Sequence, residues 1–235
     1  MEIFLRAAPV VSIEKDATGG RTAPWIIGLD DGKAAMRAFF KYIHRPRPAL
    51  LPTSYKYEIA AFELSKIVGL EIVPPVVERE IEDRPGSLQI FIDGCLTETE
   101  RRRKRIEPPD PEAFARALEN INVFENLTFA ARSDPKDVLI HEDDWTVCRV
   151  DFSEAFEPSP KLIPGQEIRR CSSKLYENLT KADPGVVKNR LAPYLNEEEI
   201  RSLLERKRLI LDRIAGLIRE KGEESVLFGE TGRKK

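Results

Sequence analysis

The stretch that most restricts the fold of this chain covers residues 122–156 (NVFENLTFAARSDPKDVLIHEDDWTVCRVDFSEAF). Its first apolar residues recur at helical spacing, which predicts a helix that ends near Ala131. A polar turn follows, and then two short apolar runs, 138–140 and 146–150, that predict a hairpin. Asp151 comes directly after the second run. The stretch therefore predicts a helix, a polar loop and a hairpin that places a carboxylate at the end of a strand.

The N-terminal part of the chain predicts strands. Apolar runs at residues 4–13, 25–29 and 35–43 are separated by polar turns. The first turn contains Gly19 and Gly20, which can bring backbone N–H groups close to a phosphate because glycine tolerates unusual dihedrals. Ordinary hairpin turns also use glycine, so this pair alone does not identify a phosphate site.

The remaining chain alternates between helical and extended patterns. Ser54 is a candidate cap for a helix that ends at Gly69, and Asn196 with Glu199 forms the capping box of a long helix that ends at Gly222. Further predicted elements are strands at 76–81 and 87–92, a charged, proline-bearing boundary at 97–111, a helix at 111–131, and short helices at 172–179 and 184–195.

Composition excludes several classes of function. The chain has 235 residues, 41% hydrophobic residues and a formal net charge of −2, so no global field favours nucleic acid. The basic run 101–105 is interpreted as a solvated helix end or loop, since acidic residues flank it. No apolar run is long enough for a membrane span, and no signal peptide is expected. Three scattered cysteines without a CxxC pair favour a reduced, cytoplasmic protein.

Several motifs together resemble a known family. They are Y-K-Y-E-I-A-A at 55–61, V-P-P at 73–75, G-S-L-Q at 86–89, V-F-E-N-L at 123–127, Val138-Leu139, Trp145, Asp151 and Ala155-Phe156. In this order they resemble bacterial kinase-like proteins related to phosphatidylinositol 3- and 4-kinases, HipA-type kinases and secretory-pathway (Fam20-like) kinases. The resemblance covers most of the chain.

The resemblance implies an α+β, two-lobed protein-kinase-like fold. Residues 1–94 would form a β-rich N-lobe, and residues 95–235 would form a mainly helical C-lobe with a catalytic-type loop at 130–137. The implied nucleotide is ATP. Its expected contacts are Gly19 and Gly20 in the glycine turn, Lys41 with its partner Glu58, and a hinge at 89–93 that includes Gln89 and Phe91. Taken alone, Glu58 could equally be a solvated helix charge.

The same resemblance implies a metal site and exposes a conflict. Asp151 and Asp137 would hold Mg²⁺, with Mn²⁺ as the alternative. Arg132, however, stands where the family has its catalytic Asp, and Asp137 stands where it has a metal-binding Asn. A guanidinium cannot accept a proton at any workable pH. We expect its charge to be drawn to the γ-phosphate or to Asp151.

Three hypotheses follow from this conflict. The leading one is a pseudokinase, a regulatory or binding module with a nucleotide cleft and an unidentified protein or small-molecule partner. The alternative is an active ATP-dependent transferase that moves a phosphoryl group or AMP and uses Asp134 or Asp137 as its base. The third is a scaffold that no longer binds nucleotide. Neither a membrane nor a nucleic acid is an expected partner.

Overall fold

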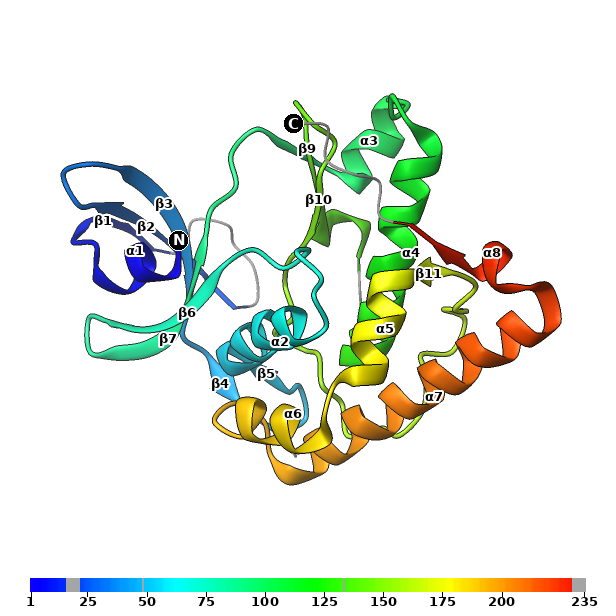
Figure 1. Ribbon diagram of the computed structural model, residues 1–235. Helices are drawn as coiled ribbons and strands as arrows, with labels where there is room; N and C mark the ends of the chain where they lie inside the picture. Colours follow the sequence, from blue (N-terminus) through cyan, green and yellow to red (C-terminus); the bar gives the residue numbers. More distant parts are fainter. Residues whose placement is uncertain (16–21, 48, 133, 230–235) are drawn as a thin grey trace.

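The computed structural model describes residues 1–15, 22–47, 49–132 and 134–229. A five-stranded antiparallel sheet lies at one end of the molecule, and most helices lie at the other (Figure 1). In spatial order the strands of this sheet are β1 (Val10–Glu14), β2 (Trp25–Asp30), β3 (Ala35–Lys41), β7 (Arg84–Ile90) and β6 (Val76–Ile81).

A short helix, α1 (Glu2–Ala7), packs on one face of this sheet. Alternate strand residues point to this face, and Ile27, Phe40 and Leu88 are fully buried there together with Leu5 of the helix. The sheet is thus closed on one side by its own N-terminal segment.

The helix α1 differs from the sequence-based expectation of a strand over residues 4–13. Only the end of that segment is extended, as strand β1. The helix has six residues, and Leu5 is its single buried side chain, so it carries no apolar periodicity to recognise. Tertiary contact fixes it instead, because Arg79 Nη1 donates a hydrogen bond to Leu5 O at 2.9 Å.

The opposite face of the sheet carries the polar residues. Strands β3 and β7 pair with Phe39 opposite Gln89 and Lys41 opposite Ser87, and directly paired residues point to the same side. Helix α2 (Tyr55–Ile67) packs against β6 and β7. Lys41 therefore faces away from α1.

Helix α2 is buried on nearly all sides. Ser54 caps it as expected, since its Oγ accepts from Lys56 N at 3.1 Å. Two of its glutamates, Glu58 and Glu63, are buried with the apolar residues of the helix. A buried carboxylate requires a partner, so both positions call for a specific ion pair.

The other elements form the helical part of the molecule. They are a three-stranded antiparallel sheet of β8 (Cys95–Thr97), β9 (Val138–His141) and β10 (Val147–Arg149); the pairs β4 (His44–Arg45) with β5 (Thr53–Ser54) and β11 (Cys171–Ser172) with β12 (Leu227–Phe228); a 3-10 turn η1 (Pro135–Asp137); and helices α3 (Glu98–Lys104), α4 (Pro111–Thr128), α5 (Ser173–Lys181), α6 (Pro184–Leu191), α7 (Glu197–Lys221) and α8 (Glu223–Val226).

Two helices in this part differ from the expected bounds. Helix α4 ends at Thr128, earlier than expected, because Phe129 adopts a left-handed conformation with φ 51°. The charged segment 97–111, expected as the boundary between the lobes, contains α3, and the basic run 101–105 forms the end of this helix, in line with its interpretation as a helix end or loop. A capping box between Thr97 and Glu100 starts α3. In the part of the chain that the structure describes, no helix has the length and apolar character of a membrane span.

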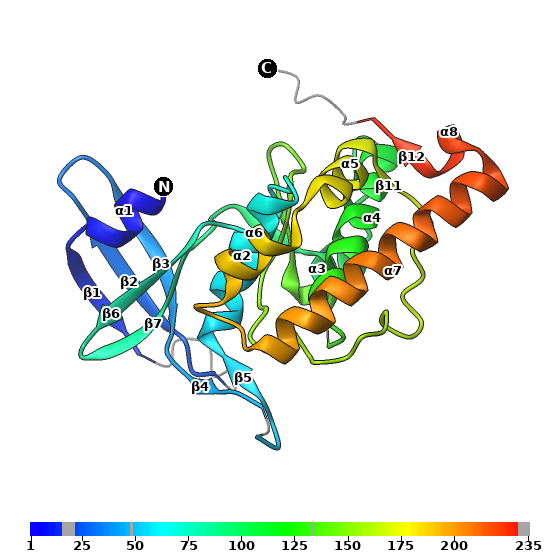
Figure 2. The ribbon, with the colours of Figure 1, turned by 60° about the horizontal axis from the view of Figure 1, so that its bottom comes forward.

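Helix α7 runs beside α4 and α5 and fixes the chain that follows Asp151 (Figures 1 and 2). Its Arg206 is fully buried and donates to the backbone oxygens of Leu127, Glu157 and Ser159 at 2.6–2.9 Å. Desolvation lowers the pKa of Arg206 to about 9. The segment after Asp151 is therefore tied to the helical core.

Candidate functional site

A cavity of about 550 Å³ lies where the sheet meets the helical part. Its volume is typical of a small-molecule site. Four of its described lining residues are cationic and four carry carboxylates. The lining residues are Thr22, Pro24, Lys41, Ala130, Arg132, Asp134, Lys136, Asp137, Arg149, Asp151, Ser153, Glu154 and Ala155.

Lys41 joins the sheet to this cavity. It is the last residue of β3, and its Nζ lies 2.5 Å from Glu58 Oε1 and 2.9 Å from Asp151 Oδ1. Burial by itself lowers the pKa of an ammonium, but the two carboxylates outweigh burial and hold the pKa of Lys41 above its ordinary value. The lysine is thus a fixed cation between α2 and the end of β10.

Glycine in the G-S-L-Q motif allows β3 to approach β7 at this point. A Cβ on Gly86 would lie 2.5 Å from Lys41 O and 2.5 Å from a ring carbon of Phe40. Backbone cannot move aside as a flexible side chain can, so only glycine fits without displacing β3. This residue therefore helps to set the position of Lys41.

Glu58 holds two partners with its two oxygens. While Oε1 pairs with Lys41, Oε2 accepts a hydrogen bond from the backbone N–H of Phe152 at 3.0 Å. Because Phe152 directly follows Asp151, one buried carboxylate positions both the lysine and the backbone next to the acid.

Asp151 sits at a sharp turn where strand β10 has ended. Its φ is 65°, a left-handed conformation that aspartate tolerates better than most residues. Ser153 Oγ donates to Asp151 Oδ1 at 2.8 Å. Burial raises the pKa of a carboxyl, but the ammonium of Lys41 and the hydrogen bond from Ser153 outweigh it, so the pKa of Asp151 lies below its ordinary value. The carboxylate is ionised and faces Lys41.

Asp137 lies on the other side of the cavity, at the end of η1. Burial raises the pKa of Asp137 to about 6; the charge of Arg149 opposes this shift, and the charge of Asp151 adds to it. Arg149 is itself buried, 2.7 Å from Glu125 on α4 and 3.9 Å from Asp137 Oδ2. Two of the carboxylates thus lie near each other with cations on either side.

Arg132, in the loop 130–137, turns to a different acid from the one expected. Its Nη1 lies 3.0 Å from Glu154 Oε2, and its side chain is 65% exposed. Of its two expected partners, the γ-phosphate and Asp151, the second is wrong, since Asp151 accepts from Lys41 and Ser153 instead; the first stays a prediction.

Asp134, the other acid considered as a base, is engaged in local structure. Its Oδ1 accepts from Lys136 N at 2.9 Å, which caps η1, and Asp137 Oδ2 accepts from Asp134 N at 3.2 Å in return. The side chain of Asp134 also lies 3.6 Å from Lys136 Nζ. One oxygen of Asp134 is thus used to cap η1, and the other faces the ammonium of Lys136.

The structure places the remaining predicted residues outside the cavity lining or outside the described chain. Gly19 and Gly20 fall in the latter group. Gln89 shares a sheet face with Lys41 but does not line the cavity, and its Nε2 has no partner among the described residues. Phe91 stacks on Phe39 with centroids 4.9 Å apart, and its N–H donates to the backbone of β3.

Sequence reasoning missed Arg149 and Glu125 as parts of the site. A signal existed, because alternation along the second hairpin strand places Arg149 on the same side as the buried Val147. An arginine at a buried strand position needs a carboxylate, and Glu125 lies in the apolar face of the preceding helix. Arg149 and Glu125 are thus both charged residues at positions where the sequence pattern calls for an apolar one, and this could have identified them as a pair.

Comparison with known proteins gives a match in structure. No described protein family and no curated protein sequence matches the chain. A solved structure of hydra Fam20 with sugar matches with a TM-score of 0.72 and 15% sequence identity, over 98% of this chain and 91% of that chain.

The chain has a Fam20-like, kinase-like fold. The match covers nearly the whole chain, so it includes both the sheet and the helical part. At this level of identity, the site itself has to be argued from its own residues.

The residues of the cavity suit a metal ion whose coordination is completed by a bound ligand. Among the described residues, no group of three or more His, Cys, Asp or Glu side chains gathers as a protein-only metal site. Asp137 and Asp151 supply two carboxylates. Mg²⁺ in nucleotide sites is commonly held by one or two carboxylates together with substrate phosphates, so the donor set fits a metal–nucleotide complex.

Proposed function

We propose that this protein is a nucleotide-binding pseudokinase, a regulatory or binding module built on a Fam20-like fold. The observation that carries the proposal is the joint contact of Lys41 with Glu58 and Asp151, at 2.5 and 2.9 Å. The family resemblance adds that Arg132 stands where such proteins have their base. Such a lysine–glutamate pair positions phosphates in kinase-like sites.

The charges of the lining support a nucleotide that binds together with a divalent cation. Its four cations and four carboxylates balance, so a polyphosphate would bring an uncompensated negative charge. Asp137 and Asp151 would hold the cation, Mg²⁺ or Mn²⁺, and Lys41 would hold phosphate. When bound, the cation supplies neutralisation of phosphate charge.

The absence of a free carboxylate at position 132 argues against phosphoryl transfer. Arg132 is a permanent donor and is paired with Glu154. Asp134 caps η1. A protein with this loop can bind the nucleotide yet lack a group that orients an acceptor hydroxyl.

One observation favours a second candidate, an active ATP-dependent transferase. The pKa of Asp137 is raised to about 6, which is close to the value that suits a general base at neutral pH. In this alternative Asp137 would accept the proton of the acceptor, and the group moved would be phosphoryl or AMP.

Two measurements separate these candidates. Isothermal titration of the protein with ATP, with and without Mg²⁺, tests the shared requirement of nucleotide binding, and metal-dependent binding is expected. Label transfer from α- and γ-labelled ATP then separates binding from catalysis. The pseudokinase proposal predicts no label transfer above the level of a Lys41→Met variant; transfer of either label would support the alternative, and no binding would leave only a scaffold.

The proposal also covers the division of the chain into lobes and its cellular compartment. We keep as predictions an N-lobe of residues 1–94, a C-lobe of residues 95–235 and a hinge at 89–93. The cytoplasm is proposed because the three cysteines are odd in number, lie far apart in the sequence and form no CxxC pair. The proposed partner, which would respond to whether a nucleotide is bound, is a protein or a small molecule.

A further inference from the structure

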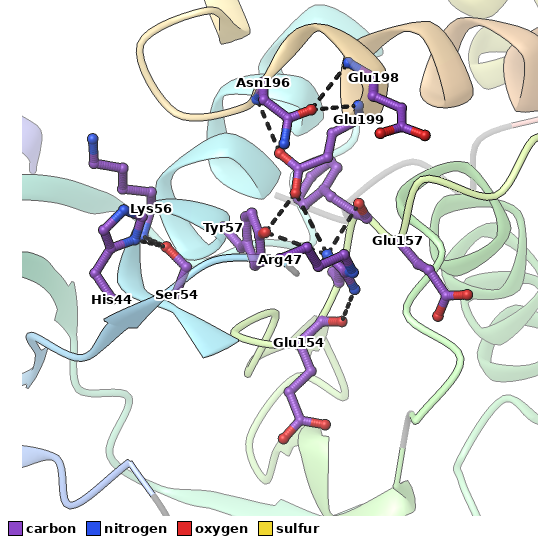
Figure 3. A network of polar contacts seen from close by, with 12 residues as sticks. His44, Arg47, Ser54, Lys56, Tyr57, Glu154, Glu157, Asn196, Glu198 and Glu199 are labelled. Atoms are coloured by element: carbon purple, nitrogen blue, oxygen red, sulfur yellow. Dashed lines mark hydrogen bonds and ion pairs between the residues drawn. The ribbon is translucent and has the colours of Figure 1, made fainter. Parts of the chain in front are cut away.

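A single arginine outside the cavity contacts both elements that form the site. Arg47 lies in the turn between β4 and β5. Its Nη1 donates to Tyr57 Oη and to the backbone oxygens of residues 155 and 156 at 3.3 Å, and its Nη2 donates to the backbone oxygen of residue 154 at 3.4 Å (Figure 3). These contacts reach helix α2 on one side and the segment after Asp151 on the other.

A buried carboxylate completes this cluster. Glu199 at the start of α7 is 2% exposed; its Oε1 accepts from Tyr57 Oη at 2.5 Å and lies 3.5 Å from Arg47 Nη1, and its Oε2 caps α7 through Asn196 N (Figure 3). Among the described residues, Arg47 is the cation within ion-pair distance of this acid. Because a buried carboxylate needs a positive partner, the cluster depends on Arg47.

The residues that Arg47 contacts are sequence neighbours of the residues that form the site. Tyr57 precedes Glu58 on α2, and residues 154–156 follow Asp151 by a few positions. A backbone hydrogen bond of 2.8 Å from Ser54 N to Ser153 O joins the same two segments. A further link is the buried hydrogen bond from Phe152 N to Glu58 Oε2. The start of α2 and the segment after Asp151 are thus connected by these two hydrogen bonds as well as by Arg47.

We propose that Arg47 is the positioning residue of this site, holding Glu58 and Asp151 in register with Lys41 from outside the cavity. The proposal rests on the proposed nucleotide-binding function. Arg47 does not line the cavity and is not placed against a nucleotide. Arginine suits the role because its planar fork offers five donors to several oxygens at once, whereas a lysine offers one rotating ammonium.

The experiment compares Arg47→Ala with Arg45→Ala in the full chain. Arg45 is an exposed arginine of strand β4, and its side chain forms no hydrogen bond or ion pair with a described residue, so it is a matched control. Two quantities are measured: the Kd for ATP with Mg²⁺, and hydrogen exchange of the Phe152 amide in the protein without nucleotide. We expect Arg47→Ala to raise the Kd about tenfold or more and to accelerate Phe152 exchange, while Arg45→Ala changes neither.

A double-mutant cycle tests whether Arg47 acts through Glu58. If it does, the loss of affinity caused by Arg47→Ala shrinks when Glu58→Gln is already present, because the contact it supports is gone. Full additivity of the two effects overturns the proposal. Should Arg47→Ala fail to fold, Tyr57→Phe removes only the hydroxyl between Arg47 and Glu199 and should shift both quantities in the same direction.

The exchange measurement keeps this inference separate from the proposed function. If the wild type binds no nucleotide, the proposed function fails, but the Phe152 amide still reports whether Arg47 holds the segment. Unchanged Phe152 exchange in Arg47→Ala and Tyr57→Phe overturns the positioning role, whatever the result with ATP.

Discussion

Lys41 and Asp151 are separated by 110 positions in the sequence, and the ammonium of the first lies 2.9 Å from the carboxylate of the second. The contact joins the end of strand β3 to the residue that follows the hairpin of β9 and β10. It also means that, without a ligand, Lys41 and Asp151 neutralise each other. Under the proposed function, binding of a nucleotide with its cation exchanges this ion pair for two new ones, to phosphate and to metal.

The first prediction concerns Asp151. Asp151→Asn removes the negative charge that would face the cation, so ATP affinity should lose its dependence on Mg²⁺. We expect the ratio of Kd values without and with Mg²⁺ to fall to about one from a wild-type ratio of roughly tenfold or more. Titration calorimetry measures both values, and a variant that retains the full Mg²⁺ effect would place the metal elsewhere.

The second prediction concerns Glu58. Glu58→Gln leaves a polar side chain near Phe152 N but removes the charge that orients Lys41. We expect ATP affinity to fall about tenfold and the free energy of unfolding to fall by roughly 2 kcal/mol. Glu63→Gln on the same helix is the control, since Glu63 pairs with Arg190 away from the cavity. It should cost stability without changing ATP affinity, and equal effects on affinity would count against the role of Glu58.

The third prediction is a pH dependence of stability that originates at Asp137. Its pKa in the folded protein is about 6, above the ordinary value of 3.8, so the folded state binds this proton more tightly than the unfolded state. The stability contribution is therefore full below the unfolded value and is lost as pH rises through about 6.

The neutral variant Asp137→Asn isolates this contribution. Between about pH 5 and about pH 7.5, the wild type should lose roughly 1.4 kcal/mol of unfolding free energy relative to the variant, one pKa unit's worth. Urea titrations of both proteins measure the difference. A constant difference across this range would mean that the pKa of Asp137 is not raised.

The fourth prediction concerns Arg132. The Arg132 side chain is largely exposed, so Arg132→Ala should change the free energy of unfolding by less than about 1 kcal/mol. ATP binding should persist in this variant. The resembling family has Asp and Arg where this chain has Arg132 and Ser133, so the double change Arg132→Asp with Ser133→Arg restores these two positions and should gain measurable transfer of γ-label. Wild-type, metal-dependent turnover that Arg132→Ala abolishes would instead make the arginine a participant in catalysis.

The elements around the site were predictable where a local pattern decides the structure. The hairpin of β9 and β10 follows from two apolar runs around a polar turn, and α2 and α7 follow from their caps, Ser54 and Asn196. The capping box of Thr97 and Glu100 was also readable, and it would have revealed helix α3 within a segment taken for a boundary.

The contacts that organise the site were not predictable from local patterns. Arg47 meets Glu199 across 152 positions, and Arg132 meets Glu154 because Asp151 already has partners. Such pairings depend on tertiary placement, which residue spacing does not encode. The family resemblance supplied Lys41 and Glu58 as candidates, and the structure places them within ion-pair distance.

The most direct test of the account is a thermal-shift titration of the wild type and Lys41→Met with ATP, with and without Mg²⁺ or Mn²⁺. Binding to the folded state alone raises its stability by about 2.7 kcal/mol at a hundredfold excess over Kd. The account predicts a metal-dependent rise in the melting temperature of the wild type that Lys41→Met lacks. No rise in the wild type, or an equal rise in both proteins, would contradict it.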